Sequence, residues 1–227
     1  MSDYKKYDLG LRDLITFRPD TLDESIIRAI LIDRTEYGFF IGAQPKIIFD
    51  VGANIGCTSI LLANSYPDAY IYAFEPDPEN FDLLSTNVKA YNNVLAWDFA
   101  LGAVTQKREL FASDDARNSG GFSFHEGGSD TSQFKTVQVF DVREFMADQR
   151  IEHIDLLKID TEGCEYEILN ALEGRMPTFI MGEAHGVDDG KMFDMLAKTH
   201  HYQINKALNA RVYPFYAQAR TFELQTH

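Results

Sequence analysis

The sequence is poor in cysteine and contains no long apolar run. Only two cysteines, Cys57 and Cys164, occur among the 227 residues, which is too few for a disulfide framework and fits no metal-ligand spacing. No apolar stretch reaches the roughly 18 residues that a membrane-spanning helix needs. The first ten residues are polar and lack the apolar core of a signal peptide. We therefore expect a cytoplasmic protein whose two thiols are reduced.

Positive charge is also scarce in the chain. There are 21 Lys and Arg residues against 35 Asp and Glu residues, so the formal net charge is −14 at pH 7. Such a surface repels phosphate backbones and anionic membranes, so neither nucleic acid nor a membrane is an expected partner. The apolar share of 45% and the charged share of 25% are ordinary for a globular protein with a core. The composition leaves open whether the protein forms a homodimer.

Apolar, strand-like runs alternate with amphipathic stretches along the chain, a pattern typical of βαβ units and a mostly parallel sheet. The strands are expected at residues 46–51, 69–74, 94–99, 154–159 and 178–181, with a closing pair at 202–206 and 211–216. We predict one α/β domain over residues 46–227, interrupted by an insertion at about 103–140. Residues 1–45 are predicted to be an accessory helical segment.

Acidic residues recur at the C-terminal ends of the predicted strands. Five strands end at or near one of them: Asp50, Glu75, Asp98, Asp160 and Glu183. In open α/β sheets, ligands bind outside the carboxyl ends of the strands. Gathering five acids at one edge is costly unless cationic or hydrogen-bond-donating ligands meet them. Any single acid would also suit a helix N-cap or a solvated turn, but together they predict a ligand site.

A glycine loop, DVGANIG over residues 50–56, follows the first strand and opens a helix. Gly52 permits a tight turn, and Gly56 allows close packing or close approach of a ligand. Glu75 lies 19 positions after Gly56 (75 − 56 = 19), a distance at which an acid binds the hydroxyls of a ribose. The loop lacks the G-x-G-x-x-G spacing that binds pyrophosphate. It therefore favours an adenosine ligand without pyrophosphate, and S-adenosylmethionine (SAM) fits because its ammonium and sulfonium groups are cationic.

Four segments, in this order, resemble FkbM-type SAM-dependent methyltransferases: DVGANIG (50–56), YAFEPDPENFDLL (72–84), LLKIDTEGCEYEIL (156–169) and IMGEAH (180–185). The resemblance implies a Rossmann-like class I methyltransferase fold, with helices on both faces of a mostly parallel seven-stranded sheet of order 3-2-1-4-5-7-6. It also implies methylation of a hydroxyl on a small molecule or glycan by direct SN2 transfer from SAM.

The resemblance implies a set of SAM-binding residues. The loop after the first strand would hold the methionine portion, Glu75 the ribose, and the residues after the third strand the adenine. The implied residues are Asp50, Gly52, Ala53, Asn54, Gly56, Glu75, Pro76, Asp98, Ala100, Leu101 and Asp160. Within the insertion, residues 118–123 resemble an Asn/Gly/Ser segment of the family, which would either close over the cofactor or substrate or form a plain surface turn, and His125 lies beside it.

Four residues are catalytic candidates, because an acceptor alcohol must lose its proton: Asp160, Glu183, His185 and Lys158. A histidine beside an acid serves as a base near neutral pH, or as a hydrogen-bonded structural group. Lys158 precedes Asp160 by two positions and so shares a face of the strand. This pair would orient a hydroxyl or satisfy a buried charge.

Three further interpretations remain open from the sequence. Asp160, Glu183 and His185, with Glu162, have the chemistry of a divalent-cation site, although their spacing does not establish one and no metal is expected. A nicotinamide-dependent oxidoreductase on the same scaffold is disfavoured by the absent G-x-G-x-x-G motif and by the absence of a Tyr-x-x-x-Lys pair. A non-catalytic SAM-binding protein would keep the cofactor loop alone.

Overall fold

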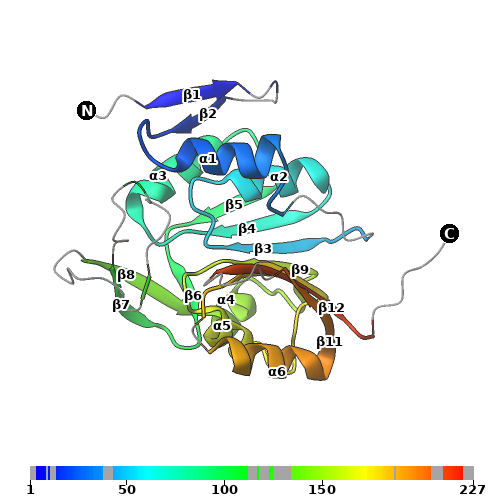
Figure 1. The fold of residues 1–227 in the computed structure, drawn as a ribbon. Helices are drawn as coiled ribbons and strands as arrows, with labels where there is room; N and C mark the ends of the chain where they lie inside the picture. Colours follow the sequence, from blue (N-terminus) through cyan, green and yellow to red (C-terminus); the bar gives the residue numbers. More distant parts are fainter. Residues whose placement is uncertain are drawn as a thin grey trace.

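A seven-stranded sheet forms the centre of the protein (Figure 1). The computed structural model describes residues 4–8, 10, 14–37, 43–111, 117, 123–124, 134–186, 188–205 and 212–221. The strands of the sheet are β3 (Ile47–Val51), β4 (Tyr70–Phe74), β5 (Val94–Trp97), β9 (Leu156–Ile159), β10 (Phe179–Ala184), β11 (His200–Ile204) and β12 (Tyr213–Ala219). Their spatial order is β11-β12-β10-β9-β3-β4-β5. When these seven strands are numbered along the chain and the order is given starting from β5, it is 3-2-1-4-5-7-6, the expected order.

The first five strands of the sheet run parallel, and β12 runs antiparallel to both of its neighbours. Helices cover both faces (Figure 1). They are α2 (Cys57–Ser65) and α3 (Pro78–Asn87) on one face, and α4 (Val142–Asp148), α5 (Glu165–Ala171) and α6 (Asp189–Thr199) on the other. This arrangement confirms the predicted Rossmann-like α/β class.

The central strand β3 shows why its apolar run is continuous. Ile48 belongs to the core cluster beneath α2 and α3, whereas Phe49 and Val51 belong to the cluster beneath α4, α5 and α6. All three side chains are almost fully buried. Since successive residues of a strand point to opposite faces, a strand covered on both sides needs apolar residues at every position.

The N-terminal segment differs from the helical segment that the sequence predicts. It contains an antiparallel hairpin of β1 (Lys5–Asp8) and β2 (Leu14–Phe17) before helix α1 (Asp23–Ile27), which continues as a π-helical turn over Arg28–Ile32. Asn87 on α3 ties the hairpin to the domain, because its side chain accepts from Thr16 N (2.7 Å) and donates to Thr16 O (3.0 Å). The segment therefore packs onto the α2 and α3 face of the domain.

The insertion folds partly as β-structure. The chain leaves the main sheet through β6 (Ala100–Gly102) and forms β7 (Gln106–Phe111) and β8 (Phe134–Asp141). These three strands make a separate sheet of order β6-β8-β7. Of the middle of the insertion, only residues 117, 123 and 124 lie within the described structure. The segment 118–122 and His125, predicted to lie near the site, fall outside it.

Cys57 and Cys164 are both buried and free, in agreement with the expectation of two thiols. Among the helices that the structure describes, none has the length and apolar character needed to cross a bilayer. Burial raises the pKa of the Cys164 thiol to about 12, so it stays protonated at neutral pH.

Candidate functional site

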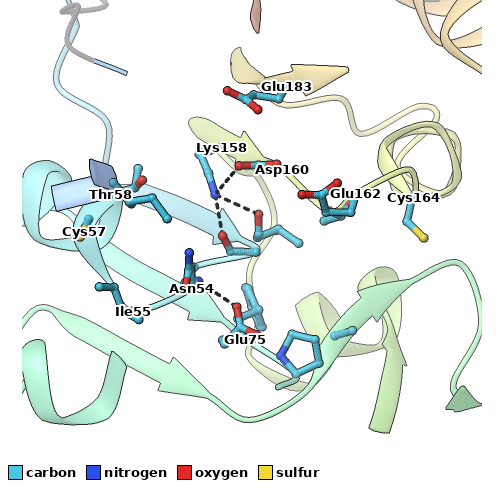
Figure 2. A pocket seen from close by; sticks show the side chains of 18 of the residues that line it. Asn54, Ile55, Cys57, Thr58, Glu75, Lys158, Asp160, Glu162, Cys164 and Glu183 are labelled. Atoms are coloured by element: carbon cyan, nitrogen blue, oxygen red, sulfur yellow. Dashed lines mark hydrogen bonds and ion pairs between the residues drawn. The ribbon is translucent and has the colours of Figure 1, made fainter. Parts of the chain in front are cut away.

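A cavity of about 250 Å³ opens at the carboxyl edge of the parallel strands (Figure 2). The loops after β3, β4 and β9 contribute to its lining, together with Glu183 of β10, the start of β6 and the N-terminal segment. Ten of the residues predicted from the sequence line it: Gly52, Ala53, Asn54, Glu75, Pro76, Ala100, Leu101, Lys158, Asp160 and Glu183. Strand ends far apart in the sequence thus meet at one place.

The loop after β3 is held against its two neighbouring strands. The amides of Gly52 and Ala53 donate to the carbonyl of Phe74 at the end of β4 (3.1 and 2.9 Å). Gly52 has a φ of 77°, and a Cβ there would lie 1.9 Å from the carbonyl oxygen of Asp160. Since only glycine fits this approach, Gly52 sets the distance between the loop and the end of β9.

Asp50 and Gly56 lie on the side of the loop that packs against the helices, and they are not part of the cavity lining. Asp50 is fully buried and accepts a hydrogen bond from Ser59 Oγ at 2.6 Å. Gly56 has a φ of 92°, and a Cβ there would lie 2.9 Å from Leu84 Cδ1. The structure thus shows both residues packed against α2 and α3, and their contact with the cofactor stays a prediction.

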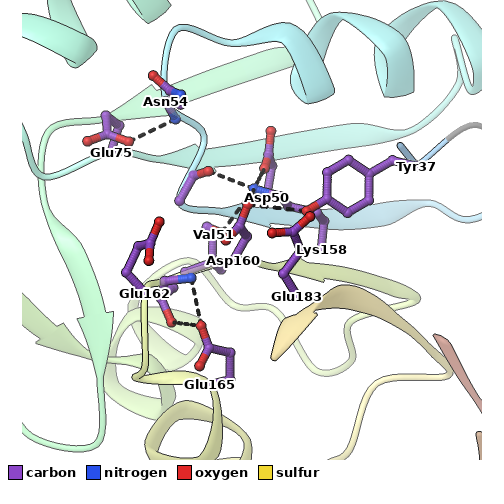
Figure 3. Close-up of polar contacts among 12 residues, drawn as sticks. Tyr37, Asp50, Val51, Asn54, Glu75, Lys158, Asp160, Glu162, Glu165 and Glu183 are labelled. Atoms are coloured by element: carbon purple, nitrogen blue, oxygen red, sulfur yellow. Dashed lines mark hydrogen bonds and ion pairs between the residues drawn. The ribbon is translucent and has the colours of Figure 1, made fainter. Parts of the chain in front are cut away.

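Glu75 lies at the end of β4 with only 6% of its surface exposed. Its Oε2 accepts from Asn54 N at 2.8 Å (Figure 3), and its Oε1 accepts from Asp77 N at 2.9 Å. Burial raises the pKa of Glu75 to about 7 despite these hydrogen bonds. Asn54 Oδ1 is also buried and finds no hydrogen-bond partner among the described residues. Both side chains therefore present polar atoms with spare capacity to a ligand.

Apolar side chains form the adjoining wall of the cavity: Phe74, Ala100, Leu101, Leu110 and Phe124. Asp98, predicted to read the adenine edge, does not take part, since it is exposed and is not among the lining residues. The reason is the turn at residues 98 and 99 between β5 and β6. It buries Phe99 against Trp97 (ring centroids 5.6 Å apart) and directs Asp98 to the surface.

Lys158 is a buried cation on β9. Its Nζ donates to Gly52 O at 2.6 Å and lies 3.4 Å from Asp50 Oδ1 and 3.8 Å from Asp160 Oδ2 (Figure 3). Burial lowers the pKa of Lys158, but the charges of Asp50 and Asp160 outweigh burial and raise it. Of the two predicted roles, these contacts favour the satisfied buried charge.

Asp160, Glu183 and His185 come together as predicted. His185 Nδ1 lies 3.0 Å from Glu165 Oε1, and its Nε2 lies 3.6 Å from Asp160 Oδ1, 3.5 Å from Glu162 Oε2 and 4.0 Å from Glu183 Oε2. Burial lowers the pKa of His185, but the hydrogen bond with Glu165 and the charge of Asp160 raise it to about 9. Burial and the charge of Asp160 raise the pKa of Glu183 to about 7. His185 does not line the cavity itself, but its Nε2 lies near the three carboxylates that do.

The N-terminal segment contributes two residues to the site that no sequence motif predicts. Tyr37 is buried, its hydroxyl donates to Asp160 Oδ2 at 3.2 Å, and its ring centroid lies 5.5 Å from Lys158 Nζ. Glu36 lines the cavity beside it, and burial with the charge of Asp160 raises its pKa. Neither residue belongs to a motif. The one available signal was the apolar helix before them, whose Ile26 and Ile30 also line the cavity.

The insertion reaches the site through Ser123, the last residue of the predicted closing segment. Ser123 Oγ donates to Glu162 O at 2.7 Å, and its backbone pairs with Phe111. Glu162 has a φ of 54° and is followed by Gly163 at 109°, a turn that follows directly on β9. The insertion is thereby attached to the loop that carries Asp160 and Glu162.

Comparisons with known proteins agree with this geometry. The family described as "Methyltransferase FkbM domain" matches residues 50–215. Methyltransferase sdnD of Sordaria araneosa is 32% identical over 171 residues, covering 61% of this chain and 66% of the relative. Hexuronic acid methyltransferase AglP of Haloferax volcanii is 24% identical over 180 residues, covering 78% and 68%. The 31-O-demethyl-FK506 methyltransferase FkbM of Streptomyces tacrolimicus is 28% identical over 199 residues, covering 72% and 75%. The chain thus spans about two thirds to three quarters of these relatives.

Proposed function

Since the chain belongs to the FkbM methyltransferase domain family, we propose that it transfers a methyl group from SAM to a hydroxyl oxygen of a small molecule or glycan. One observation carries this proposal. A single cavity joins the features of a nucleoside site, the Gly52 loop and Glu75, to the acid–base groups Asp160 and Glu183. The acceptor would bind between Asp160 and Glu183 on one side and the N-terminal segment on the other.

The lining residues fit the parts of SAM. Glu75 and Asn54 have oxygen atoms free to accept from ribose hydroxyls or an ammonium group, and the apolar wall around Leu101 suits an adenine ring. The excess of carboxylates over cations at the far end suits a positively charged sulfonium. When bound, SAM would supply an activated methyl group, so this chain has mainly to align the reacting atoms, which contributes up to about 7–11 kcal/mol.

The residues beyond the sulfonium position would handle the acceptor proton. Glu183, with a pKa of about 7, can accept a proton near neutral pH. Asp160 is held in place by the hydroxyl of Tyr37, and Lys158 fixes the loop on its other side. The acceptor hydroxyl would donate to one of the two carboxylates and lose its proton as the oxygen–methyl bond forms.

Two measurements test the proposal. Calorimetric titration with S-adenosylhomocysteine (SAH) should show saturable binding, and turnover should be measured with SAM and a panel of sugars and hydroxylated small molecules. Asp160→Asn, Glu183→Gln and His185→Ala should each lower turnover by about 10²–10⁴-fold while changing SAH affinity much less. Folded protein that gives no heat with SAM or SAH would refute the cofactor. Unchanged turnover in all three variants would refute the acid–base assignment.

A further inference from the structure

The side chains of Asp160, Glu183 and His185 converge beside the cavity from two neighbouring strands (Figure 2 labels the two carboxylates). We propose that these three side chains bind a divalent cation of the Mn²⁺ type. The role of this ion rests on the proposed function, since it would bind and orient the acceptor hydroxyl. The site itself is inferred from the positions and surroundings of the three side chains.

The spacing of the three ligand atoms suits one ion. They lie within 4.8 Å of one another, with His185 Nε2 at 3.6 Å from Asp160 Oδ1 and 4.0 Å from Glu183 Oε2. Ligands about 2.0–2.2 Å from a common ion are separated by roughly 3–4.4 Å, depending on the angle between them. Small side-chain rotations would therefore close the coordination sphere without a change in the backbone.

The orientation of His185 is an independent indication of a ligand. Its side chain is only 6% exposed, and its Nδ1 lies 3.0 Å from Glu165, whose side chain is 1% exposed. Because an ionised carboxylate can only accept, Nδ1 carries a proton, and Nε2 presents its lone pair to a metal ion once the imidazolium gives up its second proton. Nε2 points toward the carboxylates and makes no hydrogen bond within the described part of the chain. A buried carboxylate behind a histidine is the arrangement that fixes metal-binding imidazoles.

The two carboxylate oxygens of Asp160 face different partners. Oδ2 accepts from the hydroxyl of Tyr37, which leaves Oδ1 on the side of His185. The side chains of Asp160 and Glu183 are 27% and 23% exposed, so one side of the group faces the cavity. Water or an acceptor oxygen can complete the coordination from that side.

Two carboxylate oxygens with one imidazole nitrogen define the class of ion. Mg²⁺ and Ca²⁺ are bound by oxygen alone in most sites, whereas imidazole adds affinity for first-row transition metals. Mn²⁺ accepts both kinds of ligand and keeps open positions for substrate. A hydroxyl bound to such an ion loses its proton more readily than a free one, which is the task that the proposed reaction sets.

The test is a titration of the full-length, metal-free protein with MnCl₂, in which electron paramagnetic resonance measures free Mn²⁺. Wild-type protein should bind one Mn²⁺ saturably. Glu183→Gln and His185→Gln should weaken binding at least about tenfold. Glu36→Gln is the matched control, because it removes one negative charge from the same cavity without removing a ligand. This control should change Mn²⁺ affinity by less than about threefold. Circular dichroism verifies that each variant is folded.

Each outcome decides the matter. No saturable Mn²⁺ binding by folded wild-type protein would overturn the proposal, because the His185 imidazolium would then be the cation that balances the carboxylates. Equal losses in Glu36→Gln and Glu183→Gln would also overturn it, since only the general negative field would attract the ion. A parallel titration with SAH separates the two hypotheses. If the protein binds SAH but not Mn²⁺, the metal site alone is refuted. If it binds Mn²⁺ but not SAH, the proposed function is refuted.

Discussion

Glu75 is buried and accepts hydrogen bonds from two backbone amides, and these two features determine its position and its protonation state when a ligand binds. The amides of Asn54 and Asp77 fix its carboxylate at the end of β4, while burial raises its pKa to about 7. A carboxyl group with this pKa is partly protonated at neutral pH. Ribose hydroxyls donate to the ionised form, so ligand binding and proton release from Glu75 favour one another.

We therefore predict that SAH binding depends on pH through Glu75. Because the ionised form binds ribose, affinity should be about tenfold lower at pH 6 than at pH 8, and should level off above that pH. Calorimetric titrations across this range would measure the change. Glu75→Gln removes the titrating group, so its affinity should be lower throughout and flatter with pH. An identical pH profile in wild type and Glu75→Gln would contradict the assignment of Glu75.

Single residues also mark the limit of what the sequence predicts. Asp160 and Glu183 were found because each follows an apolar run predicted to be a strand, and parallel strands end at one edge. The same rule failed for Asp98, because the orientation of a turn is not visible in an apolar pattern. Tyr37 was missed because it contacts Asp160 across 123 positions of sequence, and no local motif records such a contact.

At the scale of elements, the N-terminal segment is joined to the domain by burial. Ile27 of α1 is fully buried in the cluster that also contains Ile48 of β3 and Ile60 of α2. The sequence predicted the helix, since its apolar residues recur at helical spacing. It did not predict the hairpin before it, because β1 and β2 have four residues each and β1 is polar and largely exposed.

We predict that this segment unfolds together with the domain. Ile27→Ala should lower the free energy of unfolding by about 2–5 kcal/mol, since it opens a cavity in the shared core. Ile32 lies one turn further on and is 38% exposed, so Ile32→Ala should cost less than about 1 kcal/mol. Urea denaturation followed by circular dichroism measures both. If Ile27→Ala left the main transition unchanged and added an early one, the segment would be a separate folding unit.

For the molecule as a whole, the regular parts of the fold were predictable and the site only in part. Five parallel strands, their order and the closing antiparallel pair follow from apolar runs, glycine loops and the family resemblance. The wall of the cavity supplied by residues 22–37 depends on how helix α1, its π-helical turn and the residues after them pack against the rest of the domain. Periodicity describes single elements, whereas this wall results from long-range packing between them.

Several negative charges of the molecule lie where the ligand would bind. The net charge is −14, and besides Glu75 at the nucleoside end four carboxylates line the cavity, those of Glu36, Asp160, Glu162 and Glu183. SAM carries one more positive charge than SAH, because its sulfur is a sulfonium. The field of the carboxylates should therefore favour SAM over SAH, and dissolved salt should screen part of that preference.

We predict that raising NaCl from 20 mM to 500 mM lowers SAM affinity roughly threefold more than SAH affinity, because the Debye length falls to a few ångströms. Parallel calorimetric titrations with both ligands measure the difference. Glu36→Gln, which removes one of the carboxylates without touching the nucleoside end, should reduce it. Equal salt dependence for the two ligands would mean that the sulfonium lies away from the carboxylates. The acceptor would then have to reach the methyl group from a direction that Asp160 and Glu183 do not face.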